Sequence, residues 1–250
     1  MSVTKKISLV LEAFGPQDTS LGIREIARRA NLAPSTAHRL IAELVEIGYL
    51  ERVDNGTLRL GLSLFELGHL VPQQRNLREM ALPLMEDLRY ATRQTVHLAV
   101  RDETEVVYVE ILGNQGTDLP SRVGGRMPAY CTGVGKAILA FSDPQVVQAV
   151  INQGLLKRTE HTITDANHLL RELAEIRLRG VAFDREESAI GVMCAASPIK
   201  SRNLPATSAI SVTGKRGMLD LEKVAPAVQT VARVLSRRLP IPLLSSYQRQ

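Results

Sequence analysis

The polar residues with the most suggestive spacing follow a break between two helical patterns. In REIARRANLAPSTAHRLIAEL, residues 24–44, two short runs with helical apolar spacing flank Asn31 and Pro34. Asparagine tolerates the left-handed conformation that ends a helix, and proline suits the first turn of the next one. The apolar side chains of the second run face inward, and the residues left facing outward on its first turns are Ser35, Thr36, His38 and Arg39. The pattern predicts a helix-turn-helix whose second helix has a polar leading end.

The chemistry of this leading end suits double-stranded DNA. A helix laid in the major groove presents its N-terminal residues to base edges. Serine and threonine hydroxyls contact phosphates or bases, and the guanidinium group of Arg39 can form two hydrogen bonds with guanine. Glu43 and Glu46 lie further along the same helix, so we expect them to point away from the phosphates. The alternative is a small helical domain with a solvated polar face, and the helix pair alone does not decide between the two.

A turn signal downstream favours the DNA-binding interpretation. In YLERVDNGTLRLG, residues 49–61, two short apolar runs flank Asn55 and Gly56. Asn-Gly predicts a β-hairpin because both positions readily adopt positive φ. Three helices followed by this hairpin form a winged helix-turn-helix, with the hairpin as its wing. The residues predicted to contact DNA are Arg24, Pro34, Ser35, Thr36, His38, Arg39 and Asn55.

A glycine-rich stretch in the second half of the chain suggests a different kind of site. CTGVGKAILAF, residues 131–141, fails the phosphate-loop pattern, which needs glycine where Tyr130 stands and serine or threonine where Ala137 stands. If a helix begins at Thr132, the backbone N–H groups of residues 133–135 are free at its start and can bind a carboxylate or carbonyl oxygen. The alternative is a solvated helix start capped by Thr132. The residues alone leave both open.

The segment FDREESAIGVMCAASP, residues 183–198, contains the remaining candidates for chemistry. Asp184 ends a predicted strand, and Cys194 lies in an apolar one. A buried cysteine is usually a small hydrophobic residue, and an aspartate beside other acidic residues usually belongs to a solvated turn. A catalytic Cys–His pair needs a histidine next to a cysteine, and nothing in the spacing supports one. We therefore predict no catalytic residue and no enzyme activity.

Composition bounds the class of protein. The chain has 250 residues, 44% of them hydrophobic and 23% charged, which is ordinary for a soluble protein of one or two domains. The net charge of +5 is compatible with an acidic partner, but residues 1–60 hold eight Lys/Arg against seven Asp/Glu, so the case for DNA must come from geometry. No signal peptide or membrane-spanning run is apparent. Two cysteines without a C-x-x-C motif argue against a disulfide framework or zinc site. We expect a cytoplasmic protein without metal or cofactor.

The remaining elements predict an α+β fold with a mostly antiparallel sheet. The strands are predicted in TVHLAV, EVVYVEIL, GVAFD, GVMCAASPI and ATSAISVTG, and near residues 119–123. The helices are predicted near residues 62–70, 77–88, 132–141, 144–152, 165–179 and 219–239. We place a winged helix-turn-helix domain at residues 1–61, a helical linker at 62–76, and a second, α+β domain at 77–250, for which the family resemblance described next implies effector binding and oligomerisation.

Several motifs together resemble the IclR family of bacterial transcription regulators over nearly the whole chain. The matching stretches are LGIREIARRANLAPSTAHRLIAELVEIGYLE, TVHLAVRDETEVVYVE, SRVGGRMPAYCTGVGKAILA and RLRGVAFDREESAIGVMCAASPI, with TITD and ISVTG in support. The resemblance implies a winged helix-turn-helix domain, a helical linker and a GAF-like domain that binds a small effector. It also implies dimers, or dimers of dimers, that bind palindromic operators.

The resemblance further implies where the effector binds. In the family, ligand oxygens meet backbone N–H groups at the start of the helix in the GxGKA segment, here Gly133 and Val134, and an Asp and a Cys ten residues apart, here Asp184 and Cys194. Tyr130 and Cys131 stand where relatives often have His-Ala, and we expect them to reshape the pocket. The full predicted set is Met127, Tyr130, Cys131, Gly133, Val134, Asp184, Ile190, Met193 and Cys194, with Met127, Ile190 and Met193 as the apolar wall.

These lines of reasoning predict a ligand-controlled DNA-binding regulator. We expect a repressor that binds an operator as a two-fold assembly and is controlled by a small effector with a carbonyl or carboxylate group. The apolar residues expected to pair the subunits are Leu64, Phe65, Leu67, Val71 and those along 77–88. The alternative is a small-molecule enzyme or sensor domain with a helical appendage for protein contact. The wing and the polar leading end of the third helix favour the first.

Overall fold

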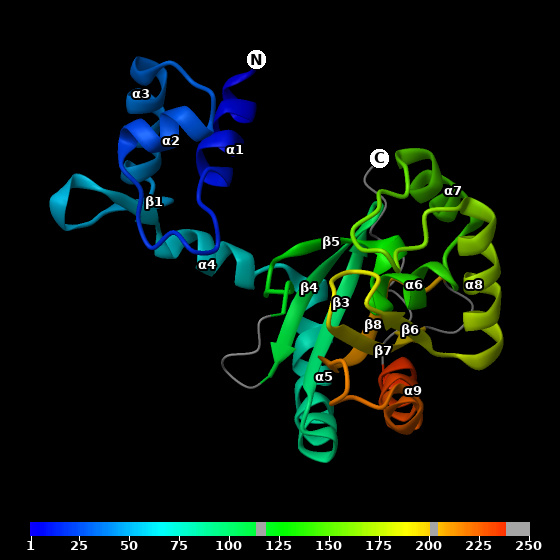
Figure 1. Cartoon of the computed structure of the whole chain (residues 1–250). Coiled ribbons are helices and arrows are strands. Elements are labelled where there is room, and N and C mark those ends of the chain that lie inside the picture. The colour runs from blue at the N-terminus through cyan, green and yellow to red at the C-terminus, as the bar shows by residue number, and fades with distance from the viewer. Residues whose placement is uncertain (114–118, 201–204, 239–250) are drawn as a thin grey trace. The chain divides into compact units, whose positions relative to one another are not determined.

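The computed structural model describes residues 1–113, 119–200 and 205–238, without the side chains of Asp54 and residues 72–75. The chain forms two compact units, Met1–Arg75 and Asn76–Gln250 (Figure 1). Within the described residues, no helix has the length and apolar character needed to cross a membrane.

The N-terminal unit contains the predicted helix break. Its elements are α1 (Val3–Glu12), α2 (Ile23–Arg29), α3 (Pro34–Glu46), β1 (Leu50–Arg52), β2 (Leu58–Leu60) and α4 (Leu62–His69). After α2 ends, Asn31 adopts a φ of 51°, and the N–H of Leu32 donates to the carbonyl of Ala27 over 2.9 Å. Pro34 then begins α3, where its missing N–H costs no helical hydrogen bond. The helix-turn-helix prediction is therefore confirmed.

The hairpin β1–β2 is the predicted wing. The strands pair antiparallel, with Leu50 opposite Leu60. At the turn, Asn55 and Gly56 have φ angles of 77° and 74°, as the Asn-Gly pair predicts. Leu58 also exchanges two backbone hydrogen bonds of 2.8 Å with Leu21. This bridge ties the wing to the segment that precedes α2, so its base is fixed to the helical core.

The C-terminal unit is built on a six-stranded sheet. Its strands are β3 (Thr95–Asp102), β4 (Glu105–Leu112), β5 (Arg126–Pro128), β6 (Ala182–Arg185), β7 (Val192–Ile199) and β8 (Ser208–Lys215). They run in the order β5-β4-β3-β8-β7-β6, and all neighbours pair antiparallel. The α+β prediction with a mostly antiparallel sheet is confirmed.

The strand predicted at residues 119–123 is wrong. None of these residues lies in a strand, and the strand begins at Arg126 instead. Gly124 turns the chain with a φ of 73°, and its N–H donates to the Tyr108 carbonyl over 2.8 Å. This bond places Met127 opposite Val106, so the pairing with β4 decides where β5 lies.

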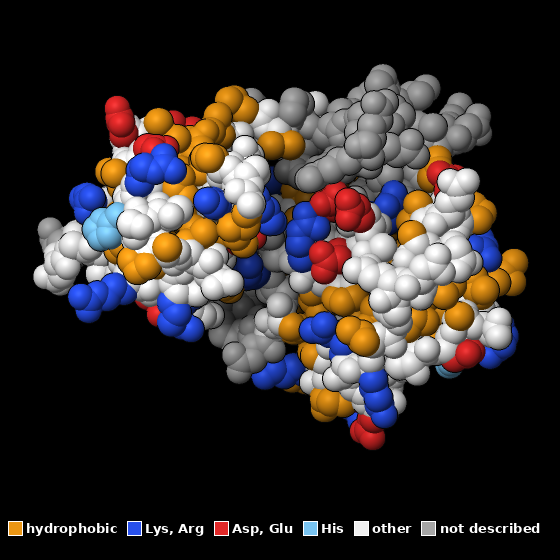
Figure 2. Space-filling view, turned by 90° about the horizontal axis from the view of Figure 1, so that it is seen from above, with side chains coloured by type: hydrophobic (Ala, Val, Ile, Leu, Met, Phe, Trp, Pro, Cys, Tyr) orange, Lys and Arg blue, Asp and Glu red, His pale blue; other side chains and the backbone are white. Residues whose placement is uncertain are grey.

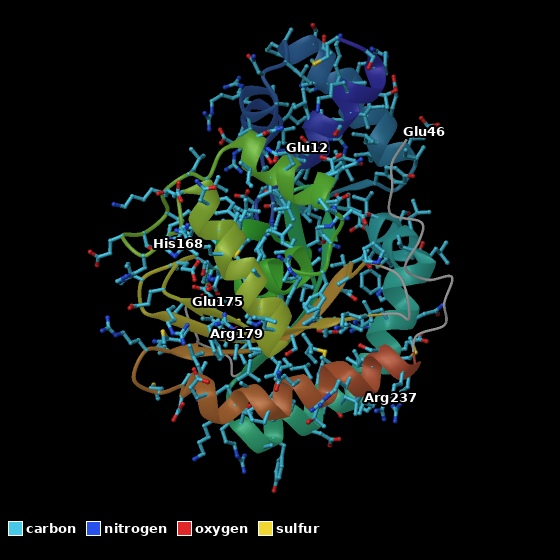
Figure 3. The ribbon with its side chains drawn as sticks, turned by 90° about the vertical axis from the view of Figure 1, so that its right-hand side faces the viewer. Glu12, Glu46, His168, Glu175, Arg179 and Arg237 are labelled. Carbon is cyan, nitrogen blue, oxygen red and sulfur yellow. The ribbon has the colours of Figure 1, made fainter. Side chains whose placement is uncertain are left out.

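Helices cover both faces of the sheet (Figures 1 and 3). The helices of this unit are α5 (Pro72–Thr92), α6 (Gly133–Leu139), α7 (Pro144–Gln153), α8 (Ala166–Arg179) and α9 (Leu221–Arg238). The hydrophobic sides of α5 and α9 form one core with alternate strand residues such as Val96 and Leu98. Helix α6 packs on the other face with Ala99 and Cys194, and α8 lies outside it. The sheet is therefore buried on both faces, and its two sets of alternating side chains belong to different cores.

Candidate DNA-binding surface and effector pocket

The predicted DNA-contacting residues all lie on the surface of the N-terminal unit. The exposed ones are Arg24, Pro34, Ser35, His38, Arg39 and Asn55, and Thr36 is half-buried. Five of the seven belong to the first turns of α3, Arg24 lies at the start of α2, and Asn55 is at the tip of the wing. The buried side of α3 is formed by Ala37, Leu40, Ile41 and Leu44. This packing fixes the outward direction of the polar side chains.

Two arginines of this unit form ion pairs of different kinds, one with the preceding loop and one on the exposed surface of α3. Arg29 is 2.7 Å from Glu25 within α2 and 2.5 Å from Asp18, and the second contact ties α2 to the loop before it. Arg39 is 2.8 Å from Glu43, one turn further along α3, and both side chains are more than half exposed. Figure 2 shows Lys and Arg side chains on this unit between hydrophobic patches.

Arg52, on the wing strand β1, is an exposed basic residue that the sequence reasoning missed. Among the residues that the structure describes, neither Arg24 nor Arg52 has an ion-pair partner. The signal for Arg52 was its place in a short strand three residues before Asn55.

A pocket in the C-terminal unit lies beside the start of α6. It holds about 320 Å³ of empty space, a volume that includes solvent at its mouth. Five of the nine predicted effector residues line it: Met127, Gly133, Val134, Asp184 and Cys194. Strands β5, β6 and β7 and the start of α6 bring these residues together from distant parts of the sequence.

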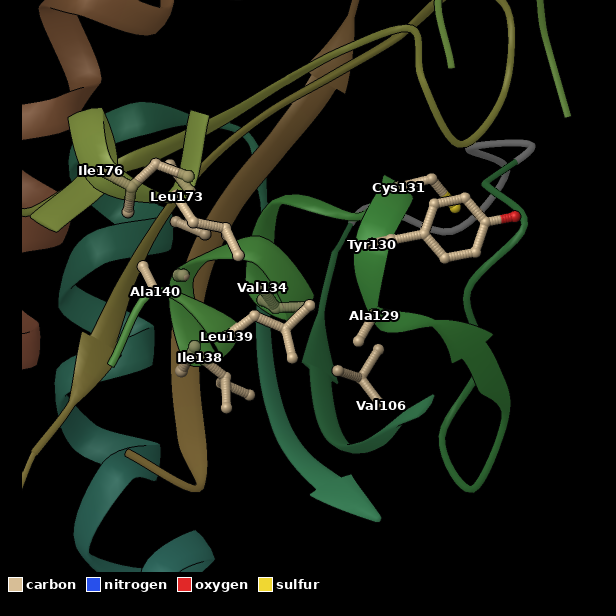
Figure 4. Packing of buried hydrophobic residues seen from close by; sticks show 14 of the residues in the cluster. Val106, Ala129, Tyr130, Cys131, Val134, Ile138, Leu139, Ala140, Leu173 and Ile176 are labelled. Atoms are coloured by element: carbon tan, nitrogen blue, oxygen red, sulfur yellow. The ribbon is translucent and has the colours of Figure 1, made fainter. Parts of the chain in front are cut away.

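The other four predicted residues lie elsewhere. Met193 packs with the core on the opposite face of the sheet, because neighbouring residues on a strand point to opposite faces. Ile190 is in the loop between β6 and β7 and is 61% exposed. Tyr130 and Cys131 are buried in the core before α6 (Figure 4). The Tyr130 hydroxyl donates to the carbonyl of Leu156 over 2.6 Å. Tyr130 and Cys131 therefore belong to the core and do not line the pocket.

The sequence reasoning missed a row of polar residues on the sheet. His97, Tyr108, Ser211 and Thr213 also line the pocket. His97 pairs with Ser211 across β3 and β8, and Thr213 pairs with Cys194 across β8 and β7. The signal was the recurrence of polar residues at alternate positions of otherwise apolar strands. Only the register, which the sequence does not show, brings them together.

The start of α6 supplies two backbone donors. The hydroxyl of Thr132 accepts the Gly135 N–H over 3.2 Å, which makes Thr132 the N-cap. The N–H groups of Gly133 and Val134, the first two residues of the helix, have no acceptor within the helix. Thr132 therefore caps one donor, and Gly133 and Val134 line the pocket. That these two N–H groups bind a ligand oxygen stays a prediction.

Asp184 is 2% exposed and is held by its own loop. Its carboxylate accepts hydrogen bonds from the Glu187 N–H over 2.7 Å, from the Ser188 N–H over 3.4 Å and from the Ser188 hydroxyl over 2.7 Å. Burial raises the pKa of Asp184, and its hydrogen bonds and the charge of Lys136 act against that shift. The carboxyl group therefore faces the pocket in an orientation set before any ligand binds.

His97 and Ser211 make the rest of this pocket wall polar but uncharged. Burial lowers the pKa of His97 to about 4, so its imidazole is neutral at neutral pH. Its Nε2 is 2.8 Å from the Ser121 hydroxyl. The buried Ser211 hydroxyl has no hydrogen-bond partner within the described part of the chain. No group of three or more His, Cys, Asp or Glu side chains among the described residues is arranged to hold a metal ion.

Comparisons with known proteins cover both units. A family profile described as IclR helix-turn-helix domain matches residues 4–54, and one described as Bacterial transcriptional regulator IclR C-terminal matches residues 69–237. The chain is 33% identical to the HTH-type transcriptional regulator XynR of Escherichia coli strain K12 over 239 residues, 93% of this chain and 95% of that one. It is 33% identical to the transcriptional repressor IclR of the same strain over 218 residues, 85% of this chain and 79% of that one.

Solved structures give the same result. An IclR homologue from Microbacterium hydrocarbonoxydans, complexed with 4-hydroxybenzoate, matches with a TM-score of 0.88 and 30% identity, covering 94% of this chain and 98% of that one. The IclR protein of Thermotoga maritima matches with a TM-score of 0.79, also at 30% identity and with the same coverage.

Proposed function

Because this chain belongs to the IclR family of bacterial transcriptional regulators, we propose that α3 reads operator DNA and that a small acid bound beside α6 controls this binding. The observation that carries the proposal is that one unit exposes the polar side chains at the start of α3, while the other unit contains a pocket beside α6. The relatives are transcription regulators, and nothing in them favours the alternative of an enzyme or sensor with a helical appendage. A protein that binds bacterial operator DNA works in the cytoplasm, and we place the chain there.

We assign base contacts to Ser35, Thr36, His38 and Arg39, with Arg24, Pro34 and Asn55 beside the DNA backbone. The N-terminal end of α3 enters the groove first, since it carries the hydroxyl and guanidinium donors that read base edges and phosphates. Arg39 must leave Glu43 to reach a guanine. An exposed pair of this kind contributes little to stability, so the exchange favours the DNA contact.

Arg39→Ala is expected to weaken operator binding about ten-fold to a hundred-fold and to relax base preference at one position of each half-site. The reason is the loss of a bidentate contact with guanine, a contact that discriminates by about 1–3 kcal/mol. Fluorescence anisotropy with operator and random duplexes measures both effects. Arg233→Ala removes the same charge from the exposed side of α9 and serves as the control. If Arg39→Ala binds both duplexes as tightly as the unsubstituted protein, α3 does not enter the groove.

For the effector we propose a small organic molecule whose carboxylate or carbonyl oxygen accepts from the Gly133 and Val134 N–H groups. Its hydroxyl or N–H would donate to Asp184, since an ionised carboxylate only accepts hydrogen bonds. Two buried anions in contact are costly, so a carboxylate must lie at the helix start, away from Asp184. The 4-hydroxybenzoate in the Microbacterium homologue has both kinds of group. A thermal-shift panel of small acids tests this, because a ligand that binds only the folded form raises its melting temperature.

We also propose that the protein binds DNA as a two-fold dimer, or as a dimer of dimers, on a palindromic operator. One helix-turn-helix reads too few base pairs to find a single genomic site. Helix α4 and the residues beside it expose a run of apolar side chains, which often marks an interface: Leu62, Phe65, Leu67, Leu70 and Val71. The expectation that residues 77–88 also pair subunits is wrong for Leu77, Met85 and Leu88. These three are buried against the sheet of their own chain.

Phe65→Glu is therefore expected to convert the dimer to monomer and to weaken operator binding. A carboxylate at this position, where the aromatic side chain is 63% exposed, would be buried without a partner in the dimer. Sedimentation velocity at micromolar concentration measures the assembly state. Met218→Glu places the same charge on another exposed apolar residue, 72% exposed, and is expected to leave the dimer intact. A monomeric unsubstituted protein, with and without DNA, would contradict the proposal.

A further inference from the structure

A buried lysine lies directly behind the effector pocket. Lys136 is on α6, one turn beyond the two free backbone donors, and is only 1% exposed. Its ammonium group forms an ion pair with Glu187 and is 3.7 Å from Glu172. Glu172 in turn is 2.6 Å from Arg179. The charge of Glu172 is therefore matched by Arg179, and the main partner of Lys136 is Glu187.

Glu187 connects this lysine to the pocket carboxyl group. Its backbone N–H donates to Asp184 over 2.7 Å, while the Thr162 hydroxyl donates to its carbonyl over 2.7 Å. Its second carboxylate oxygen, Oε2, is buried and has no partner within the described residues. Glu187 is thus anchored at its backbone and at one oxygen, and its charge remains close to Asp184.

The group as a whole carries one net negative charge. Asp184 and Glu187 are the two anions at a pH above the raised Glu187 pKa of about 7, and Lys136 is the cation that pairs with Glu187. Burying such charges costs desolvation energy, and hydrophobic replacements of buried pairs are often as stable. Stability therefore gives little reason to keep Lys136 here. Burial raises the pKa of Asp184 and of the Cys194 thiol, and the charge of Lys136 acts against both shifts. Lys136 therefore acts on two groups that line the pocket.

We propose that Lys136, which does not itself line the pocket, sets the charge of the effector that the pocket accepts. Its ammonium group offsets one of the two buried carboxylates, and this lowers the cost of placing a further negative charge at the start of α6. Lys136 therefore raises the preference of the pocket for a monocarboxylate over a neutral molecule of the same shape. This inference rests on the effector site proposed above.

The test compares an acid with its amide, which differ in charge and hardly in shape. The probes are 4-hydroxybenzoate with 4-hydroxybenzamide and lactate with lactamide, and the pair whose acid raises the melting temperature of the unsubstituted protein is used. Isothermal titration calorimetry measures the ratio of acid affinity to amide affinity. The measurements are made about one unit above the Glu187 pKa of about 7, which burial raises, so that its carboxylate is ionised.

Three variants change the buried charge in known steps. Glu187→Gln removes one anion and keeps the side-chain shape, so the affinity ratio is expected to rise about ten-fold. Lys136→Met removes the cation and is expected to lower the ratio. The double variant has the same net charge as the unsubstituted protein, and its ratio is expected to return to that of the unsubstituted protein. A purely structural role for the pair would change the affinities of acid and amide together and leave the ratio unchanged.

The outcomes separate this inference from the effector proposal. An unchanged ratio in Glu187→Gln, with the acid still bound, overturns the role of Lys136 and leaves the effector site intact. If no acid of the panel binds the unsubstituted protein, the carboxylate site itself is contradicted, and this inference is overturned with it. Lys136→Met is the variant most exposed to misfolding, and Glu187→Gln together with the double variant keeps the test decisive without it.

Discussion

Val134→Pro is expected to bind operator DNA normally and to lose its response to effector. Proline lacks the N–H that Val134 offers at the second position of α6, and a helix tolerates proline in its first turn because that N–H is not used by the helix. Loss of one hydrogen bond to a charged ligand group is expected to weaken effector binding about ten-fold to a hundred-fold. Calorimetry with the acid found in the thermal-shift panel measures this loss.

Val134→Ala is the matched control. It shortens the same buried side chain and keeps the backbone donor, so it is expected to retain most of the effector affinity. Operator binding is expected to survive in both variants, because α3 belongs to the other compact unit. Urea denaturation of both variants then reports whether the unit that contains α6 is folded. Normal effector affinity in Val134→Pro would show that the ligand does not use this N–H.

Gly135→Ala is expected to have the largest effect on stability of any single methyl group added to α6. A Cβ atom at this position would lie 2.2 Å from the carbonyl oxygen of Ala129 and 2.4 Å from its Cα. Both are backbone atoms, so the clash is relieved only by moving the helix away from the segment before it. Overpacking of a tight core costs about 1–3 kcal/mol and sometimes more. We expect the upper end of this range for the free energy of unfolding, measured by urea denaturation.

Gly133→Ala is the comparison within the same helix. Its Cβ would meet the sulfur of Cys194 at 2.7 Å, and this is the end of a side chain that can rotate. We expect a smaller loss of stability and a clear loss of effector affinity, because the methyl group and the displaced sulfur both intrude on the pocket. Equal stabilities of the two variants would contradict the assigned role of the Ala129 contact.

Local features were predictable from the sequence because local forces determine them. The turn at Asn31 and Pro34 and the hairpin at Asn55 and Gly56 each follow from the φ preferences of a few neighbouring residues. The cap at Thr132 follows from side-chain chemistry within three residues. None of these features needs information from a distant part of the chain, and the structure contains all of them.

The missed features depend on contacts between distant segments. The position of β5 follows from its register with β4, and the meeting of His97 with Ser211 follows from the register of β3 with β8. Met193 was assigned to the wrong face of the sheet. Strand β7 is buried on both sides, so its apolar residues do not show which alternate set of side chains faces the pocket. Lys136 was overlooked because a lysine is rarely fully buried unless it is paired, and its partner Glu187 lies 51 residues away.

The pair between Arg39 and Glu43 on α3 has a consequence for how regulators of this kind diverge. In the free protein Arg39, which we propose reads a guanine, already has an anionic partner 2.8 Å away, and DNA that takes up this side chain must displace that partner. A substitution at Glu43 therefore changes the affinity for all duplexes and leaves the base that Arg39 recognises unchanged. Two gene copies can thus acquire different thresholds of operator occupancy through this one codon, while they continue to share the same operator sequence.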